Sequence, residues 1–142
     1  ILDWSARGAF VLLDEAVKAG LPRAVLVSTL VLFDDYPEGY VLDETFKPKP
    51  RAEAVSLATL LAERIFREFA RQGPIHTMCL RFGDLDTQEG TPTSMALESV
   101  SRAVEAKIES DGYRWGVYNV AGTERYPLRA AKGLPLQLGR VT

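Results

Sequence analysis

Arg23-Ala24-Val25-Leu26-Val27-Ser28 is the stretch that decides the fold of this 142-residue chain. It is a short and nearly continuous apolar run, the pattern of a β-strand buried on both faces in a parallel sheet. Residues 5–19 precede it with apolar side chains at helical spacing, Ser5 as the candidate N-cap and Gly20 just beyond the end. A helix that leads into a buried strand through a short loop is half of an α/β unit.

Two further pairs of helix and strand follow along the chain. Residues 52–71 have helical periodicity and precede a β-compatible segment, residues 75–82. Residues 94–110 predict a third helix and residues 115–120 a third strand. This alternation predicts an α/β fold with a three-stranded parallel sheet covered by helices. The first strand then has an exposed apolar edge at residues 24–28, so we expect part of the sheet to lie outside this chain.

Two loops interrupt the predicted elements, at residues 33–50 and 83–92. Residues 33–50 are dense in turn formers and helix breakers, and ordered loops of this length are often functional. Its acidic pair, Asp34 and Asp35, could orient a substrate hydroxyl, but a solvated turn explains the pair as well. In the helix that follows, we expect Glu63 on the solvated side, one turn before Arg67.

Composition excludes several classes of function. Seventeen Lys and Arg against nineteen Asp and Glu give a net charge of −2, so we expect no nucleic-acid or membrane partner. The single cysteine, Cys79, and the single histidine, His76, cannot assemble a zinc site, and Cys79 is most simply a buried core residue. No apolar run approaches the length of a membrane span and the first residues do not resemble a signal peptide, so we expect a cytoplasmic protein.

In order and spacing these segments resemble the extended short-chain dehydrogenase/reductases, the NAD-dependent epimerase/dehydratase family. Residues 80–84, LRFGD, look like the family's LRFGN strand end, and residues 118–122, YNVAG, look like its YNVGxG turn. Residues 5–10 resemble its NxxGTxN helix start. The resemblance covers about residues 5–130 and implies one partial Rossmann-type domain that lacks its N-terminal half. Residues 123–142 would be a loose or truncated tail on the substrate side.

The family's proton relay is replaced in this chain. In the family a Tyr exchanges the proton, and a Lys four residues later lowers the pKa of that Tyr from near 10 toward the operating pH. With Glu63 as the anchor of the family's Tyr-x-x-x-Lys-x-x-x-Glu pattern, the Tyr position falls on Val55 and the Lys position on Thr59. Another register does not restore the pair, since residues 41–112 contain no Tyr and residues 50–106 no Lys.

The resemblance assigns the remaining site residues to the ends of two strands. Thr29 stands at the family's catalytic Ser/Thr position, and Ser28, Phe82 and Gly83 stand where the cofactor is contacted. Asp84 replaces the usual Asn and would contact substrate. The alternative for Ser28 and Thr29 is that they end a strand and bind loose backbone groups. For Arg81, near the end of the segment at residues 75–82, a phosphate contact and an ion pair under the sheet are equal alternatives.

The resemblance implies NAD or NADP as cofactor and a small-molecule substrate, of which a nucleotide sugar is one example. The Gly-rich turn that cradles the dinucleotide is absent from the sequence, so the chain is expected to be a fragment or a degenerate family member. The alternative is a non-catalytic interaction or regulatory module that keeps the scaffold. Family members often form homodimers through the helix at residues 52–71, although packing on the sheet explains its apolar positions equally.

Overall fold

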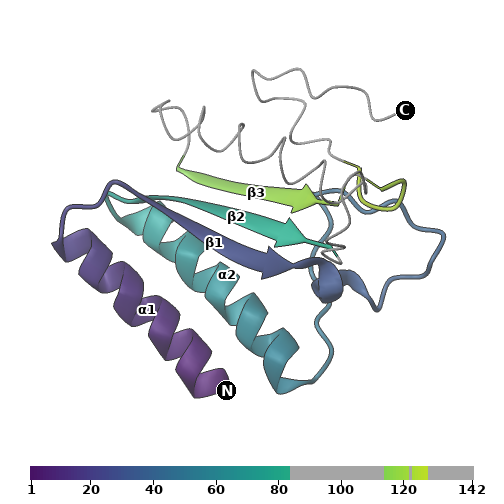
Figure 1. The fold of residues 1–142 in the computed structure, drawn as a ribbon, viewed down its shortest axis with the longest axis horizontal. Coiled ribbons are helices and arrows are strands. Elements are labelled where there is room, and N and C mark those ends of the chain that lie inside the picture. The colour runs from purple at the N-terminus through teal and green to yellow at the C-terminus, as the bar shows by residue number, and fades with distance from the viewer. Residues whose placement is uncertain (84–113, 122, 128–142) are drawn as a thin grey trace, which may run out of the picture.

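The computed structural model describes residues 1–83, 114–121 and 123–127, and the predicted helix at residues 94–110 and Asp84 lie outside this part. Figure 1 shows the strands side by side with the long helices against them. In chain order the elements are α1 (Leu2–Lys18), β1 (Arg23–Thr29), the 3-10 helix η1 (Leu30–Phe33), α2 (Ala54–Gln72), β2 (His76–Phe82) and β3 (Trp115–Val120). No helix of the described part is long and apolar enough to cross a membrane.

The sheet has the order β1-β2-β3, and both strand pairs are parallel. Arg81 in the centre is in register with Ser28 on β1 and with Asn119 on β3. The predicted α/β fold with a parallel three-stranded sheet is therefore confirmed. Because all three carboxyl ends meet at one edge, the loops that follow the strands gather there.

A glycine-dependent cap ends α1, as the sequence predicts. Gly20 has φ of 71°, and its N–H donates to the Val17 carbonyl at 3.0 Å while the Leu21 N–H donates to the Ala16 carbonyl at 2.9 Å. This pair of bonds is the Schellman motif. The N-cap prediction is wrong, because the Ser5 N–H already donates to the Ile1 carbonyl at 2.9 Å and the helix begins at Leu2.

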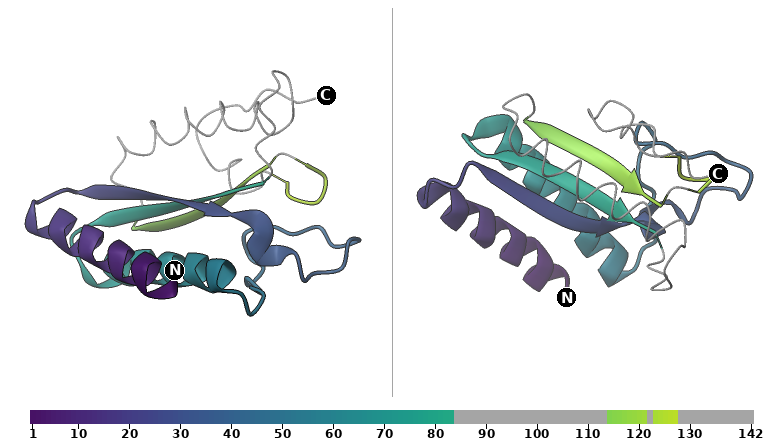
Figure 2. Two further views of the ribbon diagram at one scale, coloured as in Figure 1. Left: turned by 60° about the horizontal axis from the view of Figure 1, so that its bottom comes forward. Right: turned by 45° about the horizontal axis from the view of Figure 1, so that its top comes forward.

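The prediction that β1 is buried on both faces is also wrong. Figure 2 shows α1 and α2 on the same face of the sheet. Leu26 packs into the core under that face, whereas Val25 is 38% and Val27 is 69% exposed on the other. Because both described helices cover one face, the apolar run has only one buried side. The predicted apolar edge at residues 24–28 is confirmed for the described residues, where β1 is an outer strand.

Two apolar clusters hold the layers together. The first lies between the helices and the sheet around the fully buried Leu13 and Ile75. The second lies at the carboxyl ends of the strands and contains residues of η1, the long loop and the end of β3: Leu30, Leu32, Phe33, Leu42 and Ala121. The long loop predicted at residues 33–50 is thus packed on a core of its own. Asp35 in this loop pairs with Arg51 at 3.1 Å.

Candidate functional site

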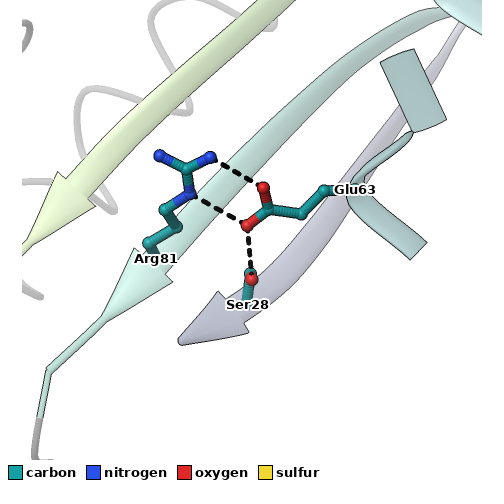
Figure 3. A network of polar contacts seen from close by, with 3 residues as sticks. All are labelled: Ser28, Glu63 and Arg81. Carbon is teal, nitrogen blue, oxygen red and sulfur yellow. Dashed lines mark hydrogen bonds and ion pairs between the residues drawn. The ribbon is translucent and has the colours of Figure 1, made fainter. Parts of the chain in front are cut away.

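A buried polar cluster joins α2 to two strands just below their carboxyl ends (Figure 3). The Arg81 Nη2 and Nε atoms donate to Glu63 Oε2 and Oε1 at 2.7 and 2.9 Å. Ser28 Oγ donates to the same Oε1 at 2.6 Å. The Arg81 guanidinium also lies 5.0 Å from the centre of the Phe33 ring. One carboxylate therefore holds α2 against both β1 and β2.

The expectation that Glu63 lies on the solvated side of α2 is wrong. Glu63 is only 3% exposed, and it shares the sheet-facing side of the helix with Ser56, Phe66 and Ala70. A carboxylate can occupy this face because Arg81 supplies a bidentate partner from the neighbouring strand. For Arg81 itself, the ion pair left open by the sequence is the observed contact.

Cys79 lies on the same face of β2 and is fully buried, as the sequence predicts. Burial raises the pKa of its thiol above the usual value, and the nearby negative charge of Glu63 raises it further. A thiol in this state is a poor nucleophile. Cys79 is thus a packing residue of the polar cluster. No group of three or more metal-binding side chains occurs among the described residues.

The hydroxyls of Ser28 and Thr29 make different hydrogen bonds. The Ser28 hydroxyl is used in its bond to Glu63, on the helix-covered face. Thr29 Oγ1 accepts the Val31 N–H at 3.2 Å and so begins η1. That bond uses the oxygen of Thr29 and leaves its own O–H as a donor. Thr29 thus binds a local backbone group, the alternative that the sequence left open, whereas Ser28 makes a tertiary contact with a side chain of α2. The contacts of both hydroxyls with cofactor or substrate stay predictions.

Val55 and Thr59 lie one turn apart near the start of α2. Val55 is 61% exposed, and the Thr59 hydroxyl donates to the Val55 carbonyl at 2.9 Å. This i to i−4 bond occupies the only polar group that either side chain has. The two positions therefore offer neither a transferable proton nor a positive charge. Their equivalence to the family's Tyr and Lys positions stays a prediction.

Phe82 and Gly83 mark the end of β2. Phe82 is buried, and the Gly83 N–H donates to the Val120 carbonyl at 3.4 Å. A Cβ at residue 83 would lie 3.2 Å from the Cβ of Ala121 and 3.6 Å from Cδ1 of Leu30. The glycine therefore lets the ends of β2 and β3 approach η1 closely. This packing does not test a cofactor contact at either residue.

Sequence reasoning missed the contacts that fasten the long loop to β3 and to the segment after it. Glu44 Oε1 accepts the backbone N–H of Asn119 at 3.0 Å, and Asn119 Nδ2 donates to the Leu42 carbonyl at 3.4 Å. Arg125 adds a bond from Nη2 to the Tyr36 carbonyl at 2.9 Å. The turn formers of residues 33–50 and the YNVAG stretch at residues 118–122 were a signal that these segments matter. Nothing in the sequence shows that they meet.

Solved structures with a similar fold belong to dehydrogenases and epimerases. A mutated uronate dehydrogenase matches 92% of this chain and 50% of its own at 20% identity and a TM-score of 0.69. A short-chain dehydrogenase/reductase superfamily protein from Agrobacterium tumefaciens, with bound NAD, covers 84% and 53% at 18% identity and a TM-score of 0.64. UDP-glucose 4-epimerase from Thermotoga maritima, with UDP-glucose, covers 84% and 48% at 18% identity and a TM-score of 0.62.

The likeness shows that the fold is that of part of a Rossmann-type domain. The chain spans about half the length of the structures it matches. No protein-family model and no curated protein matches the sequence. The fold class inferred from the motifs is thus confirmed by structure alone, at identities that do not carry activity from one protein to another.

Proposed function

We propose that this chain is a fragment or a degenerate member of the NAD(P)-dependent epimerase/dehydratase type, whose parent protein would bind NAD(P) and a nucleotide sugar or a similar hydroxyl-bearing substrate. The observation that carries the proposal is the likeness in fold to UDP-glucose 4-epimerase and to dehydrogenases solved with NAD. The exposed apolar face of β1 at Val25 and Val27 supports a fragment, because such a face calls for a covering layer.

In this proposal the chain supplies one wall of a cofactor site. The described residues offer the Thr29 O–H and the close-packed Phe82–Gly83 turn at the strand ends. They fit a cofactor only in part, since the sequence has no Gly-rich turn for the phosphates. NAD(P) would supply hydride transfer when bound, and Thr29 would donate a hydrogen bond to a substrate oxygen. With Val55 and Thr59 at the relay positions, the chain alone is inactive.

The direct test is calorimetry of the purified chain with NADH. We expect no micromolar binding, because the phosphate cradle is missing; micromolar binding would contradict the fragment proposal. A second arm uses a longer protein, if the gene encodes one, with Val55→Tyr and Thr59→Lys together. Turnover in that variant supports the epimerase/dehydratase type, whereas its absence shows that the lost pair is not the only defect.

The second candidate is a non-catalytic interaction or regulatory module with the same scaffold. Val55 and Thr59 favour this candidate, because without the family's Tyr and Lys the proton relay is lost. The helix itself and the contact of Glu63 with Arg81 are nevertheless kept. A longer protein that binds neither NAD nor NADP would favour this module. Binding of either cofactor would favour the enzyme-type parent.

We further propose that the chain forms a homodimer through α1 and α2. A groove of about 470 Å³ lies between the helices and is lined by Phe10, Val17, Leu61, Ile65 and Phe69. Phe10 is 52% and Leu61 is 42% exposed. Light scattering should show a dimer that Phe10→Asp breaks and that Leu12→Asp, outside the groove on the same helix, leaves intact.

A further inference from the structure

A second pocket, of about 210 Å³, lies on the helix-covered face of the sheet between the long loop, α2 and β3. The loop contributes Glu44 and Lys47, and α2 contributes Glu63, Arg64 and Arg67. Trp115 and Val117 of β3 and Arg81 of β2 also line it, and the remaining lining residues are Thr45, Phe46, Pro48 and Leu60. Its volume is below the range of roughly 300–1,000 Å³ typical of drug-sized ligands. The pocket therefore suits a small group.

The charge of this pocket is positive although the chain as a whole carries −2. Both carboxylates are already engaged, Glu63 by Arg81 and Glu44 by the Asn119 N–H. Lys47, Arg64 and Arg67 are exposed at the rim. None of these three has an ion pair among the described residues, so their charges are available to a ligand.

Two buried polar atoms have no partner among the described residues, one on Arg81, which lines the pocket, and one on Asn119 of the neighbouring strand. Arg81 is 5% exposed, and its Nη1 makes no hydrogen bond. Figure 3 shows this nitrogen on the side of the guanidinium turned away from Glu63 and toward β3. Asn119, the register partner of Arg81 on β3, has an Oδ1 that is likewise unpaired. A buried donor and a buried acceptor on neighbouring strands call for a ligand that offers both functions.

We propose that this pocket binds a phosphate group. Arg81 Nη1 donates to one phosphate oxygen from inside the pocket, and Arg64, Arg67 and Lys47 contribute positive charge from the rim. Guanidinium groups match the geometry of phosphate oxygens well. A protonated phosphate oxygen can also donate to Asn119 Oδ1, which sulfate cannot do at neutral pH. The inference goes beyond the proposed function and does not depend on NAD binding.

The test is calorimetric titration of the whole chain with inorganic phosphate at pH 7 in a buffer free of other oxyanions. We expect saturable one-to-one binding that weakens with added chloride, because the rim charges are exposed to screening. Sulfate should bind about ten-fold more weakly, a difference of the size expected for one lost hydrogen bond. Glucose 1-phosphate in a parallel titration shows whether the site takes a phosphomonoester as well as the free ion.

Arg67→Ala should weaken phosphate binding about five-fold, as expected for one partly exposed charge contact. Arg71→Ala is the matched control, since Arg71 lies one turn further along α2, outside the pocket, and pairs with Glu68. Absence of saturable phosphate binding, equal affinity for sulfate, or equal loss in the Arg71 variant would each overturn the proposal. Circular dichroism of both variants shows that the fold is retained.

Discussion

Glu63 on α2 and Arg81 on β2 form a bidentate ion pair whose side chains are 4% and 6% exposed. The pair lies at the turn of α2 that the family pattern uses as its anchor, and Ser28 extends it to β1. Helix and sheet are therefore joined by charge directly below the candidate site. An ion pair so deeply buried leaves a costly unpaired charge when either partner is removed.

The first prediction is that Glu63→Gln strongly destabilises the fold. The variant leaves the Arg81 guanidinium buried without its counter-charge, which is expected to cost about 3–5 kcal/mol in the free energy of unfolding. Urea unfolding followed by circular dichroism measures the change. Arg71→Ala, which breaks the exposed pair with Glu68 on the same helix, should cost only about 0–1 kcal/mol. Equal losses in the two variants would show that burial of the Glu63 pair does not matter.

The second prediction is that substitution by alanine has opposite effects on stability at two glycines. Gly20→Ala should destabilise by about 1–2 kcal/mol, because residue 20 has φ of 71° and an L-residue is strained there. Gly8→Ala should stabilise by about 1 kcal/mol, since Gly8 lies inside α1 and a Cβ there meets no atom within 4 Å. Thermal unfolding of the two variants measures both signs. A loss of stability in the Gly8 variant would contradict this account of α1.

The sequence predicted the order of elements and the parallel sheet because helical and strand periodicities are local signals. Helix α2 and strand β3 were found to within two residues, and the Gly20 cap was found from residue type alone. The long loop was also evident from its turn formers. The prediction that was wrong depended on how the elements pack together. Strand β1 was expected to be buried on both faces, but both described helices cover the same face of the sheet.

The same limit applies to the candidate site. The pattern identified Glu63 as an anchor, but helical spacing could not show that Arg81, eighteen residues away, draws it into the interior. The contact of Glu44 with Asn119, 75 residues apart, is equally invisible in one sequence. Ser28 was expected near the cofactor, and strand alternation places its hydroxyl on Glu63. Tertiary pairing of polar groups was the missing information.

The third prediction is that Cys79 is unreactive in the folded chain. Burial and the charge of Glu63 raise the pKa of its thiol, so almost no thiolate exists at pH 8. A disulfide reagent should modify Cys79 only as fast as the chain unfolds, and at full speed in urea.

The same shift has a defined pH dependence. The stability contributed by the neutral thiol is fully present below the unfolded-state pKa of about 8.5 and is lost as the pH rises from there toward the raised folded-state value. Cys79→Ala should lack this part of the alkaline decline. Rapid labelling of the native chain at pH 8 would mean that Cys79 is accessible.

The fourth prediction uses the open face of β1. Val27 is 69% exposed and Leu26, its neighbour, packs into the core, so substitutions at the two positions should behave differently. Val27→Thr keeps the β-branched shape and should change the free energy of unfolding by less than about 0.5 kcal/mol. It should also lower the binding of a dye such as ANS, because apolar surface is removed. Leu26→Ala, at a partly buried position that packs against the core, should cost about 1–3 kcal/mol because apolar contacts are lost. If Val27→Thr were as costly as Leu26→Ala, Val27 would have to be covered in solution, by a part of this chain outside the described residues or by a second copy. Analytical ultracentrifugation of the two variants would separate these cases, since only cover by a second copy depends on protein concentration.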